Sequence, residues 1–101
     1  MDNRPAKMDS LIGRLAAEFF HFKSSNQSLI TVNDCRTSPD GRRVDIFISV
    51  WPEQARDTAL SFTKRKRGEL RDYIKKNSRL RSMPHIDITL VPGIPPEEPP
   101  A

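Results

Sequence analysis

One stretch of the chain, residues 64–81 (KRKRGELRDYIKKNSRLR), is rich in the side-chain types that commonly bind phosphates. It holds nine Lys or Arg and only two acids, a net charge of +7, whereas the whole chain of 101 residues carries +4. Such an uneven distribution favours an anionic partner, with nucleic acid ahead of an acidic membrane surface. The plainer alternative is a solvated helix face. The cationic residues are Lys64, Arg65, Lys66, Arg67, Arg71, Lys75, Lys76, Arg79 and Arg81.

The spacing of these cations places several of them on one side of a helix. At about 100° per residue, side chains four positions apart drift slowly around the same face. Leu70, Tyr73, Ile74 and Asn77 then occupy the adjacent side and face the core. Like charges four apart cost an isolated helix roughly 0.2–0.5 kcal/mol per pair, which an anionic partner would offset. The four-residue series is Arg67, Arg71, Lys75 and Arg79.

Gly68 interrupts this helical pattern. A glycine inside a helix costs about 1 kcal/mol relative to alanine. Its presence therefore indicates that this position has a structural or functional need for glycine. A straight helix from Ala55 to Ile74 would place Lys66 among the apolar positions. We therefore expect a kink at Gly68, where the missing Cβ relaxes the backbone. The alternatives are a Lys66 that snorkels to solvent and a glycine tolerated in a regular helix.

The residue types and spacings give little support for metal binding or catalysis. His21 and His85 have no Cys or carboxylate at metal-ligand spacing, and Cys35 has no visible base partner. We expect no catalytic residues, no metal and no cofactor. A single cysteine favours a reducing compartment. No apolar run reaches the ~20 residues of a membrane helix, and the first ten residues lack a signal-peptide core. We expect a soluble intracellular protein.

The hydrophobic pattern predicts a small α+β domain over residues 1–91. The expected order is a helix over 6–22, strands over 29–37 and 42–50, a long helix over 53–79, and a strand over 83–91. The first two strands form a hairpin around the turn SPDG, and helices cover one face of the sheet. The third strand can pair in parallel with the second or at the edge with the first. The last ten residues, 92–101, contain five prolines and are predicted to be a disordered tail.

Two apolar patterns define the expected core. The second strand alternates strictly at Val44, Ile46, Ile48 and Val50, so these side chains should face inward. The first helix carries one broad apolar stripe. Its members are Met8, Leu11, Ile12, Leu15, Ala16, Phe19 and Phe22.

Two segments of this pattern carry a family resemblance. LITVNDCRTSPDGRRVDIFISV resembles the hairpin of the ribosome-binding factor A family through Ser38, Pro39, Asp40 and Arg42. RGELRDYIKKNSRLRSMPHIDI resembles its Gly-aromatic-Leu-Arg…Leu-Arg…Pro run through Gly68, Leu70, Arg71, Ile74, Leu80, Arg81 and Pro84. The resemblance covers about residues 8–90. Lys66 replaces the usual alanine of the kink, Glu69 replaces an aromatic residue, the loop after the first helix is shorter, and the segment after the last strand is replaced by prolines.

The resemblance implies a fold similar to a type II KH domain, ordered helix-strand-strand-helix-kink-helix-strand. It implies a monomeric, non-catalytic factor of the bacterial cytoplasm or an organellar matrix. Such a factor binds 16S-type rRNA and assists late maturation of the small ribosomal subunit. The nine cations of 64–81 would contact phosphates, with Arg42 and Arg43 as secondary contacts. The alternatives are a KH-like module for another RNA, and a protein-interaction adaptor that uses the proline-rich tail.

Overall fold

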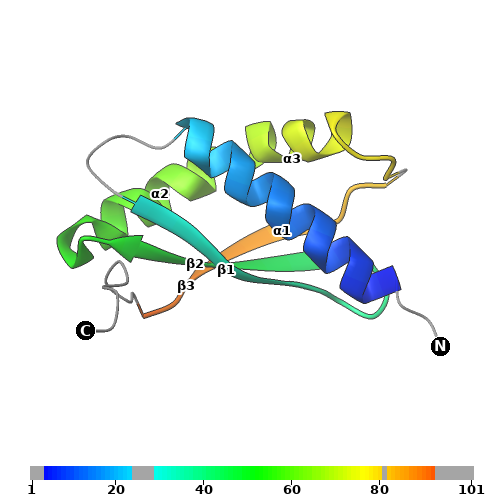
Figure 1. Ribbon diagram of the computed structural model, residues 1–101, viewed down its shortest axis with the longest axis horizontal. Helices are drawn as coiled ribbons and strands as arrows, with labels where there is room; N and C mark the ends of the chain where they lie inside the picture. Colours follow the sequence, from blue (N-terminus) through cyan, green and yellow to red (C-terminus); the bar gives the residue numbers. More distant parts are fainter. Residues whose placement is uncertain (1–3, 24–28, 81, 93–101) are drawn as a thin grey trace, which may run out of the picture.

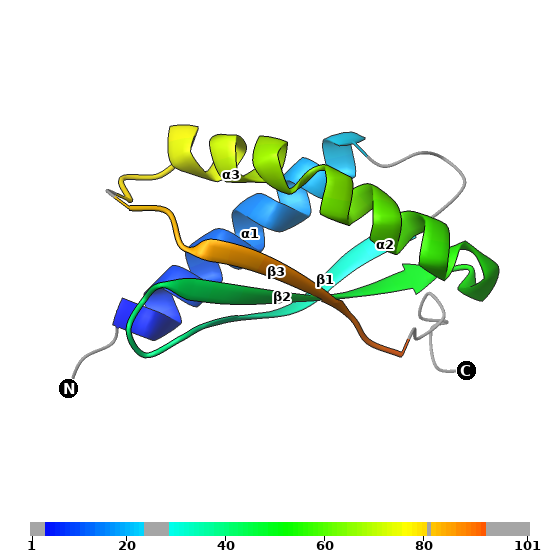
Figure 2. The same ribbon diagram turned by 180° about the vertical axis from the view of Figure 1, so that it is seen from behind.

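The computed structural model describes residues 4–23, 29–80 and 82–92. Figures 1 and 2 show the helices on one face of a sheet, so the expected α+β class and layer arrangement are confirmed. The elements in chain order are α1 (Arg4–Lys23), β1 (Leu29–Thr37), β2 (Arg43–Trp51), a 3-10 turn η1 (Glu53–Ala55), α2 (Arg56–Arg65), α3 (Arg67–Lys76) and β3 (His85–Leu90).

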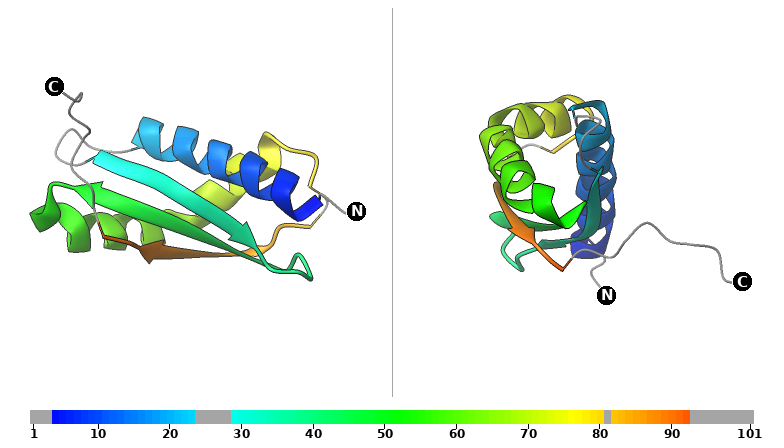
Figure 3. Two further views of the ribbon diagram at one scale, coloured as in Figure 1. Left: turned by 60° about the horizontal axis from the view of Figure 1, so that its bottom comes forward. Right: turned by 90° about the vertical axis from the view of Figure 1, so that its left-hand side faces the viewer.

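The sheet is mixed, with β2 at its centre (Figure 3). β1 pairs with β2 in antiparallel orientation, whereas β3 pairs with β2 in parallel. Of the two pairings that the sequence left open for the third strand, the structure has the parallel one. The α2–α3 pair supplies the long crossover that a parallel connection requires.

The turn between β1 and β2 follows from its residue types. Gly41 has a positive φ of 73°, a conformation that glycine adopts at no steric cost. The Ser38 hydroxyl lies 2.6 Å from an Asp40 carboxylate oxygen, which also accepts a hydrogen bond from the Arg42 N–H at 3.0 Å. These local bonds set the register of the hairpin and place Arg42 and Arg43 at the start of β2.

The core lies between the sheet and the helices. All four alternating residues of β2 are buried, as expected, and Ile86 and Ile88 of β3 join them. A bulge between Val32 and Asp34 shifts the alternation of β1 by one residue. Cys35 therefore points into the core, where it is buried as a packing residue.

The stripe of α1 differs from the prediction at its C-terminal end. Phe22 is 67% exposed, whereas Phe20 is buried at 1%. The Phe22 ring lies at the surface, 6.3 Å from the Tyr73 ring in an edge-on arrangement. Phe22 thus covers the contact between α1 and α3, and Phe20 takes the place in the core that was assigned to Phe22.

The long helix predicted over 53–79 is divided in two, and its break is centred on Lys66 rather than on Gly68. Lys66 has φ −92° and ψ 6°, outside helical values, and its N–H donates to the carbonyls of both Phe62 and Thr63. The chain turns where these shared hydrogen bonds tighten the last turn of α2. Gly68 lies just beyond, inside the first turn of α3.

α3 ends at Lys76, earlier than predicted, so Asn77 follows the helix and is exposed instead of facing the core. The Asn77 side-chain amide donates to the Tyr73 carbonyl at 2.8 Å and so caps the last turn. Such side-chain bonds compete with continuation of a helix. Arg79 consequently lies in the segment after α3 and not on the helix.

Two further predictions concern the ends of the chain and membranes. Residues 93–101 of the predicted tail lie outside the described residues. Among the residues that are described, no helix has both the length and the apolar character that crossing a bilayer requires.

Candidate nucleic-acid interface

A groove of about 730 Å³ runs beside α3 and brings together cations that the sequence placed in one stretch. A smaller hollow of about 210 Å³ adjoins it and shares Gly68 and Arg71 with it. The groove is lined by Arg65, Gly68, Glu69, Arg71, Asp72, Lys75, Ser82 and Met83. The smaller hollow is lined by Arg67, Gly68, Arg71, Pro84, His85 and Ile86.

The helical period explains why α3 presents cations to this groove. Leu70 and Ile74 are fully buried, so the opposite side of the helix must face solvent. Gly68, Arg71 and Lys75 lie on that opposite side, three and four residues apart. Ser82 and Met83, which lie between α3 and β3 in the chain, form the other wall.

The predicted phosphate-binding residues divide into two groups by position. Four of them, Arg65, Arg67, Arg71 and Lys75, line the groove or its smaller extension. Arg81 lies outside the described residues. The others line neither the groove nor the smaller hollow, and they are Lys64, Lys66, Lys76, Arg79, Arg42 and Arg43.

The same residues divide differently by charge pairing. Lys66 pairs with Glu69 at 2.9 Å, Arg67 lies 3.9 Å from Asp87, and Arg43 lies 2.9 Å from Asp87. In contrast, several cations form no ion pair with any described carboxylate, and these are Lys64, Arg65, Arg71, Lys75, Lys76, Arg79 and Arg42. The unpaired groove cations Arg65, Arg71 and Lys75 are exposed and available to an anion.

Two acidic residues, Glu69 and Asp72, reduce the positive charge of the groove. Glu69 is held by Lys66 and by Lys23, whose ammonium lies 3.6 Å away, and the hydrogen bond from Lys66 is the main reason that the pKa of Glu69 is lowered. Asp72 is exposed at the groove. With four cations and two acids among its lining residues, the groove and its extension remain net positive.

Gly68 lies at the meeting point of the groove and the hollow. A Cβ built on Gly68 would have no neighbour within 4 Å, and its φ is not positive. Neither packing nor backbone conformation within the described protein therefore requires glycine here. The missing side chain instead leaves the backbone of α3 open to close approach from the groove.

Sequence reasoning missed the second wall of the groove. Ser82 and Met83 come from the segment before β3, and nothing in their types indicates a site. The side chain of His85, for which the sequence indicated no metal site, is 67% exposed, and its Nε2 lies 3.2 Å from an Asp87 oxygen. Pro84 was the available signal, because it separates the helix from the strand and makes the chain turn back.

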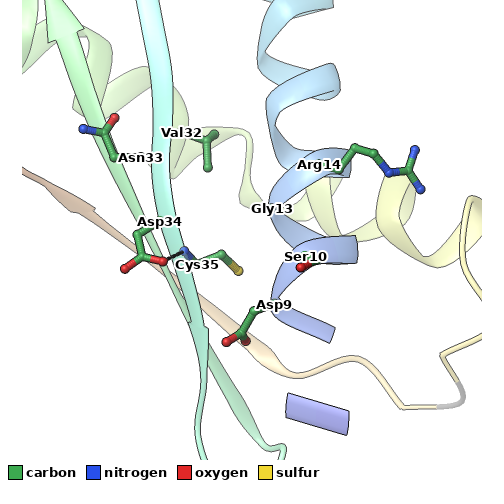
Figure 4. Close-up of a pocket in the computed structure, with 8 residues that line it drawn as sticks. All are labelled: Asp9, Ser10, Gly13, Arg14, Val32, Asn33, Asp34 and Cys35. Atoms are coloured by element: carbon green, nitrogen blue, oxygen red, sulfur yellow. Dashed lines mark hydrogen bonds between the residues drawn. The ribbon is translucent and has the colours of Figure 1, made fainter. Parts of the chain in front are cut away.

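A second pocket of about 370 Å³ lies between α1 and β1 and contains Cys35 (Figure 4). Burial is the main cause that raises the pKa of the Cys35 thiol to about 12, and the carboxylates of Asp9, Asp34 and Asp45 add to it. Asp9 accepts a hydrogen bond from the Thr37 N–H at 2.7 Å. Because a reactive cysteine needs a lowered pKa, this thiol is suited to packing and not to nucleophilic attack.

Replacing Gly68 by alanine tests whether the glycine serves a partner. We expect Gly68→Ala to leave stability unchanged or to raise it by up to about 1 kcal/mol, because alanine favours the helix and meets no neighbour. The variant should nevertheless bind an anionic partner more weakly. Gly41→Ala is the control, since its positive φ predicts a loss of stability of about 1 kcal/mol or more. Urea denaturation and binding assays on both variants measure this, and a Gly68→Ala variant that is less stable would contradict the assignment.

The raised pKa of Cys35 predicts a pH-dependent stability. Above its ordinary pKa of 9.0 the unfolded chain loses the thiol proton, while the folded chain keeps it up to about pH 12. Stability should therefore fall as the pH rises from about 9 to 12. Urea denaturation at pH 8 and pH 10 should show a smaller fall for Cys35→Ala than for the wild type. Rapid modification of Cys35 by a thiol reagent in the folded protein at pH 8 would refute its burial.

The chain is similar to known proteins in sequence and in fold. The family model for Ribosome-binding factor A matches residues 4–90. A ribosome-binding factor A of Fervidobacterium nodosum is 33% identical over 61 residues, which are 59% of this chain and 49% of that protein, so the chain spans about half the length of this relative. The crystal structure of ribosome-binding factor A from Thermus thermophilus has a TM-score of 0.75 at 22% identity, covering 85% of this chain and 94% of that one.

A homology model of the Thermus thermophilus factor, fitted into a cryo-EM map of a 30S–RbfA complex, has a TM-score of 0.69 at 22% identity, covering 80% of this chain and 88% of that one. At these identities the two structural likenesses establish the fold. The family match, which extends over residues 4–90 of 101, establishes the family. The chain therefore belongs to the ribosome-binding factor A family.

Proposed function

We propose that this chain binds the small ribosomal subunit by contacting phosphates of its 16S-type rRNA along the groove beside α3. It assists late maturation of the subunit without catalysing a reaction. One observation carries the proposal: three exposed cations, Arg65, Arg71 and Lys75, line one groove and have no carboxylate partner among the described residues. Membership of the ribosome-binding factor A family supports it. So does the fitting of a structural relative into a map of a 30S–RbfA complex.

The shape of the site favours nucleic acid over a membrane. The unpaired cations line a concave groove, whereas a flat anionic bilayer would be met by a convex or flat face. Arginine also suits phosphate oxygens, because its planar guanidinium can donate two parallel hydrogen bonds to them. Arg65 and Arg71 supply two such groups in the groove, and the exposed backbone at Gly68 leaves room for a sugar-phosphate chain to approach.

Contacts of this kind provide affinity and orientation but read little base sequence. The specificity of the chain would then come from the shape of the folded rRNA that presents several phosphates at matching positions. Lys64, Lys76, Arg79 and Arg42 are exposed and form no ion pair with a described carboxylate, so they are candidates for further phosphate contacts. Residues 1–91 would act as one RNA-binding domain and as a monomer, and contact by Arg81 remains a prediction from the sequence.

A salt series on paired variants tests the function. We expect wild-type protein to bind purified small ribosomal subunits with an affinity that falls steeply with salt. Arg71→Gln combined with Lys75→Gln should lower the slope of log affinity against log salt by about 1.4–1.8, because each lost phosphate contact contributes about 0.7–0.9. Fluorescence anisotropy of labelled protein at several salt concentrations measures the slope.

The matched control loses the same charge elsewhere. Arg14→Gln combined with Arg36→Gln removes two exposed cations of α1 and β1 that are paired with Glu18 and Asp34. This control should keep the wild-type slope. Equal slopes for the two double variants would show that overall charge, and not the groove, drives binding. Sucrose-gradient sedimentation of a cell extract adds a second check, and absence of the protein from the small-subunit fractions would refute the proposal.

A further inference from the structure

Asp87 lies where three basic side chains from three elements meet. One of its oxygens is 2.9 Å from Nε of Arg43 of β2, and the other is 3.2 Å from Nε2 of His85 and 3.9 Å from the Arg67 guanidinium of α3. Its register partner on β2, Asp45, has a side chain exposed to almost the same degree, 33% against 32%, but contacts Arg43 at 3.4 Å and not Arg67.

Arg67 lies between two surfaces of the molecule. Its guanidinium donates a hydrogen bond to the backbone carbonyl of Ile86 at 3.5 Å and lies 3.9 Å from the carboxylate of Asp87, both of β3. The same residue lines the smaller hollow together with Arg71, so it also borders the groove assigned to RNA phosphates. Arg67 therefore has one anionic partner within the protein and a place beside the proposed site of another.

Of the contacts that Asp87 makes with basic side chains, the one with Arg67 can be broken at the lowest cost. At 3.9 Å it is the longest of the ion pairs around Asp87, and the Arg67 side chain is 42% exposed. Asp87 would retain the closer partners Arg43 and His85 if Arg67 moved away. A long and exposed pair contributes little to stability, so its loss would barely affect the fold.

We propose that Asp87 limits the affinity of the groove for RNA by competing with an RNA phosphate for Arg67. In the free protein Arg67 is held toward Asp87, and in the complex it turns to a phosphate beside Arg71. This inference rests on the proposed function. It assigns a role to a carboxylate, whereas the proposed function assigns roles only to cations.

Asp87→Asn is the direct test, and Asp45→Asn is its matched control. Both variants remove one negative charge from neighbouring positions of the same sheet face, but only the first releases Arg67. We expect Asp87→Asn to bind small ribosomal subunits about two- to fivefold more tightly at low salt, because an exposed pair of this kind is worth that much. Asp45→Asn should tighten binding clearly less. Adding Arg67→Gln to Asp87→Asn should abolish the gain.

Equal tightening by both variants, no change, or weaker binding by Asp87→Asn would overturn the inference. In those cases salt-dependent binding by the wild type would leave the proposed function standing. Wild-type protein that binds neither small subunits nor oligouridine RNA would instead refute the proposed function, and the inference with it.

NMR of the wild-type protein keeps the inference falsifiable if Asp87→Asn fails to fold. On addition of oligouridine RNA, the side-chain Nε–H signal of Arg67 and the carboxyl carbon signal of Asp87 should both shift. A shift at Arg71 without a change at Arg67 and Asp87 would show that Arg67 is not transferred.

Discussion

The orientation of α3 depends on two fully buried side chains, Leu70 and Ile74. Because they lie four residues apart on a helix, burying both leaves no freedom in which face of α3 meets solvent. Tyr73 strengthens this arrangement, since its ring lies 5.7 Å from that of Phe19 and its hydroxyl is 3.0 Å from Glu18. Burial is the main cause that raises the pKa of Tyr73, so the hydroxyl remains a donor to the Glu18 carboxylate. The position of Arg71 and Lys75 is thus a consequence of the core.

The sheet determines which cations remain unpaired. Asp45 and Asp87 are register partners on β2 and β3, and their side chains neutralise the basic residues that reach that part of the sheet. On the outer side of α3, no carboxylate of the described residues forms an ion pair with Arg71 or Lys75. Arg71 and Lys75 therefore stay available, although they belong to the same run of charge as Arg67. One basic stretch in sequence becomes two electrostatic environments in space.

Local sequence patterns predicted much of the fold correctly, because the relevant interactions are short in range. The alternation at Val44, Ile46, Ile48 and Val50 specified the inner face of β2, and the SPDG turn specified the hairpin. The errors occur where neighbours in space override the pattern. Examples are Phe22, whose expected place in the core is taken by Phe20, and the helix break, which is centred on Lys66 and not on Gly68.

By itself the sequence determined that the chain carries a dense positive stretch, that much of this stretch is helical with Leu70 and Ile74 facing inward, and that an anionic partner is favoured. Composition and helical period are enough for these conclusions. Only the tertiary structure decided which cations share a groove and which are neutralised. That outcome depends on the parallel pairing of β3 with β2, which places Asp87 within reach of Arg43 and Arg67. A residue's charge is set by its type, but its partners are set by chain segments that meet only when the sheet forms.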